Sequence, residues 1–242
     1  MKKEYWWIII AYIAMHLSSI IGIPIITLAG AGMGKSLEEM KLIAPPYWLV
    51  ISFSLTLLIV LLLLRKEYKT SDMRNAASPA NSISWAIAGI FLALMAQSIA
   101  ASIESMVGIE MGSENTQQII KLIERFPIVI LVSSIIGPIL EEIVFRKIIF
   151  GSLHKRMNFF LAALISSVIF ALAHAEPEHI LLYSAMGFTF AFLYVKTKRI
   201  IVPIVAHVTM NTFVVLLQSV FREDIERMLR EAEKIQSIIG GF

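Results

Sequence analysis

The sequence has no cysteine and few charged residues. Without cysteine, the chain can have no disulfide framework, no thiolate metal site and no cysteine nucleophile. Asp, Glu, Lys and Arg make up only 16% of the 242 residues, whereas an ordinary soluble domain contains about 25%. The net charge of +3 is small, and no cluster of basic residues resembles a nucleic-acid-binding surface. We therefore expect neither an ordinary soluble domain nor a nucleic-acid partner.

Apolar residues dominate the composition, at 57% of the chain. A membrane-spanning helix needs about 20 mostly apolar residues, and seven stretches come close to that requirement: 6–28, 47–64, 82–103, 127–152, 157–174, 179–195 and 200–221. The first follows two lysines, as in a signal peptide, but it is longer than a typical signal-peptide core and is expected to be a retained span. The sequence predicts an all-α fold, a polytopic transmembrane helix bundle of about seven spans, with residues 1–242 forming a single membrane domain.

Three polar segments outside these stretches also have expected structures. The polar segment 104–125 is expected to form a loop followed by an interfacial helix. Residues 222–239 repeat apolar positions at steps of three and four, which predicts a C-terminal amphipathic helix. Glu176, Glu178 and His179 lie in a short turn that contains a proline, and we expect them to be solvated.

The distribution of basic residues predicts an orientation in the membrane. If the N-terminus lies inside, the inner segments 1–5, 65–81, 146–156 and 196–199 hold 13 of the 21 Lys and Arg residues. The outer segments then hold 13 of the 18 acidic residues. The positive-inside rule therefore predicts a cytoplasmic N-terminus and an outer C-terminus. The sequence names no host, but a compact, cysteine-free chain fits a multi-pass protein of a bacterial plasma membrane.

The fourth apolar stretch carries two adjacent carboxylates, Glu141 and Glu142, followed by Arg146. A charged side chain near the middle of a span costs about 2.5–3.5 kcal/mol on insertion scales, so lipid-facing positions are improbable for all three. Glu142 and Arg146 stand four residues apart, which favours a structural ion pair on one helix face. Glu141 is rotated by about 100° from that face and is the carboxylate left for chemistry. Pro138, just before it, predicts a break in helix hydrogen bonding.

Two further spans contain polar side chains on apolar faces. Span 157–174 ends with Phe170 and His174 four residues apart, and span 200–221 carries His207 and Asn211 with the same spacing. Each pair alone is compatible with an interfacial histidine or with interhelical hydrogen bonding. Together with Glu141, however, they form a polar set from three separate helices, which predicts an intramembrane site.

The three motifs resemble the signature of a known family: Glu-Glu-x-x-x-Arg (Glu141, Glu142, Arg146), Phe-x-x-x-His (Phe170, His174) and His-x-x-x-Asn (His207, Asn211). This is the CAAX protease and bacteriocin-processing family of intramembrane glutamic endopeptidases, also called the Abi family. The chain is similar to bacterial members in length and motif order. The resemblance covers residues 127–221, which would form the catalytic core.

The resemblance implies that the protein hydrolyses a peptide bond of a membrane-associated or lipidated substrate by means of an activated water. Glu141 and His174 would hold and deprotonate that water, because a carboxylate in a dry site binds protons more tightly and suits a general base. His207 and Asn211 would stabilise the oxyanion as hydrogen-bond donors. Glu142 and Arg146 would position Glu141, and no cofactor is implied.

Three alternatives stay open. Two histidines and a glutamate also match the ligands of a zinc site, so the same residues are compatible with a zinc-dependent membrane protease. A non-enzymatic regulatory or scaffold protein could use the same fold, although a scaffold has no need to bury such a polar set. A proton or ion carrier could use a buried chain of Glu and His, but no inverted repeat supports a transporter.

Overall fold

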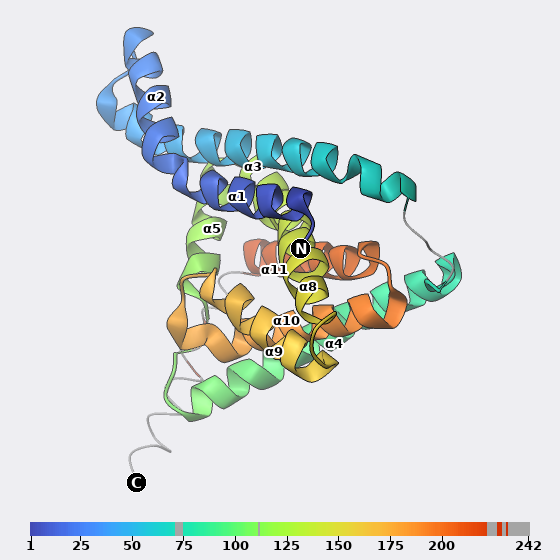
Figure 1. The fold of residues 1–242 in the computed structure, drawn as a ribbon. Coiled ribbons are helices and arrows are strands. Elements are labelled where there is room, and N and C mark those ends of the chain that lie inside the picture. Colours follow the sequence, from blue (N-terminus) through green and yellow to red (C-terminus); the bar gives the residue numbers. More distant parts are fainter. Residues whose placement is uncertain (71–74, 111, 222–226, 229–230, 232–242) are drawn as a thin grey trace.

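The computed structural model describes residues 1–70, 75–110, 112–221, 227–228 and 231. Within these ranges the ordered elements are helices and none is a strand (Figure 1), so the predicted all-α fold is confirmed. In chain order they are α1 (Lys3–Leu17), α2 (Ser19–Gly32), α3 (Leu37–Thr70), α4 (Pro79–Met106), α5 (Glu114–Arg125), α6 (Val129–Leu131), η1 (Val132–Ile136), α7 (Gly137–Glu141), η2 (Glu142–Phe150), α8 (Gly151–Leu153), α9 (Phe159–Leu172), η3 (Pro177–His179), α10 (Ile180–Thr197) and α11 (Ile201–Val220). The predicted amphipathic helix 222–239 falls almost wholly outside the described residues.

The long helices pack as a bundle, and α5 lies across one end of it. In Figure 1, α1, α3, α4, α10 and α11 run broadly along one direction, with the broken helical run 129–153 between the α1–α3 pair and the remaining helices. Helix α10 packs on α4 and α9, and α11 packs on α4 and on η1. The predicted interfacial helix in segment 104–125 is present as α5, whose apolar side contributes the buried residues Ile120 and Ile123.

Among the described residues, four helices are long and apolar enough to cross a membrane: Leu37–Glu67, Pro79–Met106, Pro177–Thr197 and Ile201–Gln218. Helices α1 and α2 meet at a bend of 49° and make a fifth span if they are taken as one. Of the other expected spans, 127–152 is divided into short α- and π-helical segments, and α9 has only 14 residues. The described helices therefore support a helical membrane bundle with four or five spans by length and composition, and the count of seven stays a prediction.

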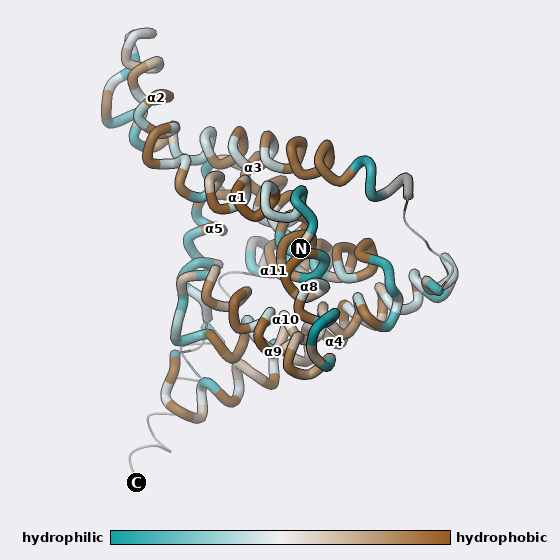
Figure 2. The backbone as a smooth tube through the Cα atoms, in the orientation of Figure 1, coloured by the Kyte–Doolittle hydropathy of each residue, from teal (hydrophilic) through white to brown (hydrophobic). Residues whose placement is uncertain are grey.

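The exterior of the bundle is apolar, as a lipid-facing surface requires. Large apolar side chains such as Ile20, Leu28, Phe91 and Phe160 are exposed on it. Figure 2 shows hydrophobic colour along the long helices, and hydrophilic colour on α5 and at the ends of the long helices. Large exposed apolar areas are uncommon on soluble proteins, so this surface fits a bundle covered by lipid.

The segments predicted to share one membrane side meet at one end of the bundle. Glu67, near the end of α3, contacts Lys2 Nζ at 3.1 Å and Lys147 Nζ at 2.9 Å. In the α10–α11 turn, Arg199 Nε donates to the Ala77 carbonyl at 2.6 Å. The four basic segments therefore group together in space as the orientation requires, while the membrane side that they face stays a prediction.

The helical run 129–153 alternates between α- and π-helical turns. Pro138 has no N–H and cannot bond the carbonyl four residues before it. Its neighbour Gly137 donates to the Val132 carbonyl, five residues back, which is a π-helical bond. The irregularity predicted at Pro138 therefore takes the form of π-helical segments on both sides of α7. Such turns are frequent at functional sites, and α7 ends at Glu141.

Helices α9 and α10 approach each other closely at a glycine. A Cβ on Gly187 would lie 3.0 Å from the Cβ of Ser167 on α9 and 3.1 Å from its Cα. Only a residue without a side chain allows the two backbones to come this near. The close contact brings the C-terminal end of α9, where His174 follows, against the first turns of α10.

Candidate active site

A buried charge cluster lies at the start of η2. The side chains of Glu142 and Arg146 are both 0% exposed, and Arg146 Nε lies 3.2 Å from Glu142 Oε2. This is the ion pair that the spacing of the two residues predicts. The guanidinium also lies over the rings of Phe170, at 4.2 Å from the centroid, and Phe190, at 5.5 Å. Among the described residues, none of the guanidinium nitrogens has a hydrogen-bond partner, so the ion-pair contact and the aromatic faces take the place of hydrogen-bond acceptors.

Glu142 also fixes the orientation of His207. Its Oε1 lies 2.9 Å from His207 Nδ1, and its Oε2 lies 3.2 Å from Arg146 Nε. A carboxylate only accepts hydrogen bonds, so Nδ1 carries a proton and Nε2 faces away from Glu142. Nε2 lies 3.8 Å from Glu141 Oε2, and the ring stacks on Phe190 at 4.6 Å. The sequence predicted that Glu142 positions Glu141, whereas its hydrogen bond goes to His207.

His174 is fixed by its own helix and by α10. Its Nδ1 lies 2.8 Å from the Phe170 carbonyl, and because a carbonyl only accepts, Nδ1 is the donor. In a neutral ring, Nε2 is then the nitrogen with a free lone pair. One edge of the ring contacts Phe170 with centroids 4.5 Å apart. One face stacks on Tyr183 at 4.0 Å and an interplanar angle of 23°.

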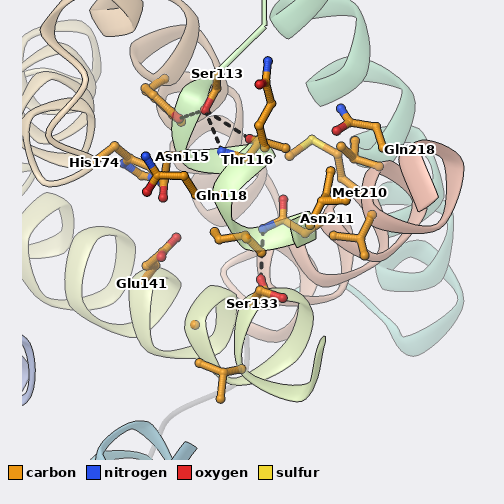
Figure 3. Close-up of a pocket in the computed structure, with 18 of the residues that line it drawn as sticks. Ser113, Asn115, Thr116, Gln118, Ser133, Glu141, His174, Met210, Asn211 and Gln218 are labelled. Carbon is orange, nitrogen blue, oxygen red and sulfur yellow. Dashed lines mark hydrogen bonds between the residues drawn. The ribbon is translucent and has the colours of Figure 1, made fainter. Parts of the chain in front are cut away.

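Asn211 lies one turn after His207 on α11, as the spacing predicts. Its Nδ2 is 3.5 Å from the Ser133 carbonyl of η1, which is a long contact for a hydrogen bond. The amide is therefore only weakly engaged by the protein, and it has a second N–H to offer to a ligand. Figure 3 shows Asn211 and Ser133 next to each other in the cavity wall, joined by this contact.

The four candidate residues Glu141, His174, His207 and Asn211 line one cavity of about 890 Å³. Figure 3 shows His174 and Asn211 on different walls, with Glu141 projecting from its helix toward the space between them. The Glu141 side chain is 20% exposed while that of Glu142 is 0% exposed, so the two adjacent carboxylates have different surroundings. The structure thus brings together the polar set predicted from three separate helices.

The opposite wall of the cavity comes largely from α5 and the residues before it. Ser113, Asn115, Thr116 and Gln118 are on this wall (Figure 3). These side chains are hydroxyls and amides, which donate and accept hydrogen bonds without adding charge. A cavity of this size, mostly apolar with a few convergent polar groups, is typical of ligand sites.

The prediction of a solvated turn after α9 is wrong for two of its three residues. Glu178 is exposed, but Glu176 is only 7% exposed and His179 only 5%. His179 Nδ1 contacts Glu104 Oε2 at 2.9 Å, and its Nε2 donates to the Gly112 carbonyl at 3.2 Å. The physical reason is that each polar group finds a partner on a segment about 60 to 75 positions away.

Helical spacing in the sequence could have indicated that these residues are buried. Glu176, His179 and Tyr183 are spaced by three and four positions, which places them on one side of a helix. Glu104 lies at the end of an apolar span, where a lone carboxylate needs a partner. Tyr183, to which none of the sequence motifs assigns a role, stacks on His174 and lines the cavity.

The described residues contain no group of three or more His, Cys, Asp or Glu side chains spaced to hold a metal ion. Glu141, His174 and His207 share the cavity, yet the Nδ1 atoms of both histidines already bond to protein oxygens. A zinc site on these residues would have to use their Nε2 atoms together with Glu141.

Comparison with known proteins gives consistent matches. The family model described as Type II CAAX prenyl endopeptidase Rce1-like matches residues 123–213. The chain is 53% identical over 246 residues to YdiL of Bacillus subtilis (strain 168), named as a candidate membrane peptidase, which covers 100% of this chain and 99% of that relative. It is 39% identical over 163 residues to the membrane-embedded CAAX protease MroQ of Staphylococcus aureus (strain USA300), over 64% of this chain and 66% of the relative. No solved structure matches.

The matched region and the cavity coincide. All four candidate residues lie within 123–213, the part matched by the family model. The relative that matches over the full chain carries a peptidase name, and both named relatives are bacterial. The chain therefore belongs to the Rce1-like CAAX protease family of membrane peptidases.

Proposed function

We propose that this protein is an intramembrane glutamic endopeptidase that cleaves a peptide bond of a membrane-associated or lipidated substrate. The observation that carries the proposal is the convergence of Glu141, His174, His207 and Asn211 on one cavity. A carboxylate, two imidazoles and an amide supply a proton acceptor, a water-orienting group and oxyanion donors. The protein would reside in the plasma membrane of a bacterium with a cytoplasmic N-terminus.

In the proposed reaction a water molecule lies between Glu141 and His174. The Nε2 lone pair of His174 accepts one hydrogen bond from the water and aims its oxygen at the scissile carbonyl. As the oxygen attacks the carbonyl carbon, its other proton passes to Glu141. Protonated Glu141 then gives this proton to the leaving nitrogen, and the C–N bond breaks. Glu141 thus ends the cycle as a carboxylate, as it began.

His207 and Asn211 stabilise the oxyanion in this scheme. Asn211 donates from Nδ2, and His207 donates from Nε2 when both of its ring nitrogens carry protons. An imidazolium at His207 would make the cluster of Glu141, Glu142, Arg146 and His207 electrically neutral, since two negative and two positive charges cancel. A neutral buried cluster avoids most of the cost of isolated charge in a low-dielectric site.

The substrate that fits the cavity is a peptide segment in an extended conformation. A peptide backbone that enters a membrane protein must satisfy its N–H and C=O groups there. The amides and hydroxyls of α5 line the wall opposite Glu141 and can pair with that backbone. The apolar lining suits uncharged side chains or a lipid chain.

Replacement of Gln118 by Leu is expected to weaken substrate binding without slowing the chemical step. One or two neutral hydrogen bonds would be lost at about 0.5–1.5 kcal/mol each, so KM should rise about 3–10-fold while kcat stays within about twofold. Glu114→Gln, on the same helix but outside the cavity lining, is the matched control. An unchanged KM for Gln118→Leu would contradict a substrate wall on α5.

Removal of metal ions is expected to leave the activity unchanged. The proposed water activation uses only Glu141 and His174, so a strong chelator such as 1,10-phenanthroline should leave the rate within about twofold. The assay uses purified protein in liposomes and a fluorogenic peptide ending in a CAAX sequence, offered with and without a farnesyl group. Activity that is lost to the chelator and restored by zinc would establish the zinc-dependent alternative instead.

The function itself is tested by comparing the membrane peptides of cells that carry wild-type protein or Glu141→Ala. A substrate should accumulate uncleaved in the variant and be cleaved in the wild type. Its sequence then supplies a second fluorogenic peptide for the purified protein. If neither this comparison nor the CAAX peptides reveal any wild-type cleavage, the proposed function fails.

A further inference from the structure

A second polar cluster lies beside the proposed active site, where the turn after α9, the start of α10 and the start of α5 meet. At its centre is the carboxylate of Glu176. Glu176 Oε1 accepts from the Asn115 backbone N–H at 2.7 Å, and Oε2 accepts from the Ser113 hydroxyl at 2.7 Å. The Tyr183 hydroxyl also donates to Oε2 at 2.5 Å. One carboxylate thus joins the start of α10 to the start of α5, which lies 61 to 63 positions away in the sequence.

Glu176 is built to remain ionised. Burial acts to raise the pKa of its carboxyl group. Hydrogen bonds from Asn115, Tyr183 and Ser113 together lower the pKa by more than burial raises it, so the net shift is downward. The carboxylate also lies at the N-terminus of α5, where a negative charge is favoured. Ser113 caps the same helix by accepting from the Thr116 N–H at 3.0 Å. A charged acceptor with these donors holds the Tyr183 hydroxyl strongly.

The chain reaches this arrangement through a constrained turn. Ala175, between His174 and Glu176, has φ of 58°, a left-handed conformation that is uncommon for residues with a Cβ. It reverses the chain so that His174 faces the cavity while Glu176 faces α5. Observed outliers of this kind concentrate at functional sites.

The start of α10 is pinned separately. Glu104 on α4 accepts from the Leu182 N–H at 2.9 Å and pairs with His179 at 2.9 Å. The backbone just before Tyr183 is therefore held against α4 before its hydroxyl reaches Glu176. The Tyr183 ring has little freedom, because its backbone and its hydroxyl are both fixed.

The Tyr183 ring in turn limits the motion of His174. The two rings stack at 4.0 Å with an interplanar angle of 23°. The Phe170 carbonyl fixes only one atom of the imidazole, Nδ1, and the ring could still tilt about that contact. A second constraint on the face of the ring sets the direction in which Nε2 points.

We propose that Tyr183, held by Glu176, is a positioning residue that sets the plane of the His174 ring and so aims Nε2 at the attacking water. The proposal rests on the function proposed above for His174. Through Ser113 and Asn115 the same carboxylate ties this plane to the docking of α5, the wall on which the substrate would bind. Correct docking of α5 and the correct direction of His174 Nε2 are thereby coupled.

Two substitutions separate the hydroxyl from the ring. Tyr183→Phe keeps an aromatic ring but removes the bond to Glu176 that holds this ring against His174, and kcat is expected to fall about 3–10-fold with KM within about twofold. Tyr183→Leu also removes the stack, and kcat should fall about 30–100-fold, because small misalignments of reacting groups can cost about 100-fold. Glu176→Gln should lower kcat as Tyr183→Phe does and should also raise KM, because it weakens the contacts with Ser113 and Asn115 at the start of α5. Thr189→Val, which removes a hydroxyl elsewhere on α10, should leave both constants unchanged.

A readout without substrate distinguishes failure of this proposal from failure of the proposed function. In histidine-labelled protein the His174 ring protons, assigned with His174→Gln, should be shifted upfield by the Tyr183 ring in NMR spectra. That shift should shrink in Tyr183→Phe and Glu176→Gln, while melting temperatures and the Thr189→Val spectrum show that the fold is kept. An unchanged shift together with an unchanged kcat in folded Tyr183→Phe would overturn the positioning role, even if the wild type cleaves peptides. If the wild type cleaves nothing, the NMR shift alone decides whether Tyr183 orients the ring.

Discussion

Glu141→Gln is expected to lower the rate of peptide-bond hydrolysis by about 10²–10⁴-fold, the range attributed to a positioned general acid or base. A glutamine side chain has the same shape as glutamate and still forms hydrogen bonds, but its amide cannot take a proton from water. Glu141 lines the cavity, with Oε2 3.8 Å from His207 Nε2. The rate is measured with purified protein in liposomes and the fluorogenic peptides described above.

The matched control for this prediction is Glu178→Gln. It makes the same chemical change at an exposed glutamate of the turn after α9 and should leave the rate unchanged. A Glu141→Gln protein that still cleaves within tenfold of the wild type would exclude Glu141 as the base. Proton flux across the liposomes that depends on Glu141, without any cleavage, would favour the carrier alternative.

Arg146→Met is expected to destabilise the fold by about 3–5 kcal/mol, the usual cost of removing one partner of a buried ion pair. The substitution leaves the carboxylate of Glu142, which is 0% exposed, without its cation. It also removes the cation–π contact with Phe170 at 4.2 Å. Thermal unfolding in detergent, followed by circular dichroism, should show a large drop in Tm relative to Arg65→Met, which removes a charge near the end of α3.

A double variant separates the structural and catalytic parts of this cluster. Replacement of both charges of a buried pair by neutral groups is often close to neutral for stability, so Glu142→Gln with Arg146→Met should recover most of the lost Tm. Activity should stay low, because the neutral amide that replaces the Glu142 carboxylate could not hold His207 as a charged acceptor does at 2.9 Å. A double variant as unstable as Arg146→Met would show that the pairing with Glu142 is not the source of the loss.

The location of the active-site candidates could be inferred from the sequence because polar groups in apolar helices are costly. Glu141, His174, His207 and Asn211 each lie within or at the end of an apolar stretch, and a bilayer tolerates such residues mainly where they face the bundle interior or a cavity. Helical spacing also gave the pairing of Glu142 with Arg146. These inferences need only local periodicity and the energetic cost of burial.

The contacts between distant segments could not be inferred in the same way. Glu104 and His179 are 75 positions apart, and each taken alone resembles a solvated residue near a helix end. The hydrogen bond between His207 and Glu142 was not predicted either, because spacing places a side chain on a helix face but does not say which neighbouring helix lies there. The π-helical turns around Pro138 were predicted only as an irregularity, since the shift to a five-residue hydrogen bond depends on local packing.

The central claim is that Glu141 and His174 act on one water molecule, and the rates of four proteins test it most directly: wild type, Glu141→Gln, His174→Ala and the variant with both changes. Residues that act as a unit give strongly non-additive losses. The double variant is therefore expected to be within about threefold of the slower single variant. Losses that multiply, or a His174→Ala protein with the wild-type rate, would contradict the shared water.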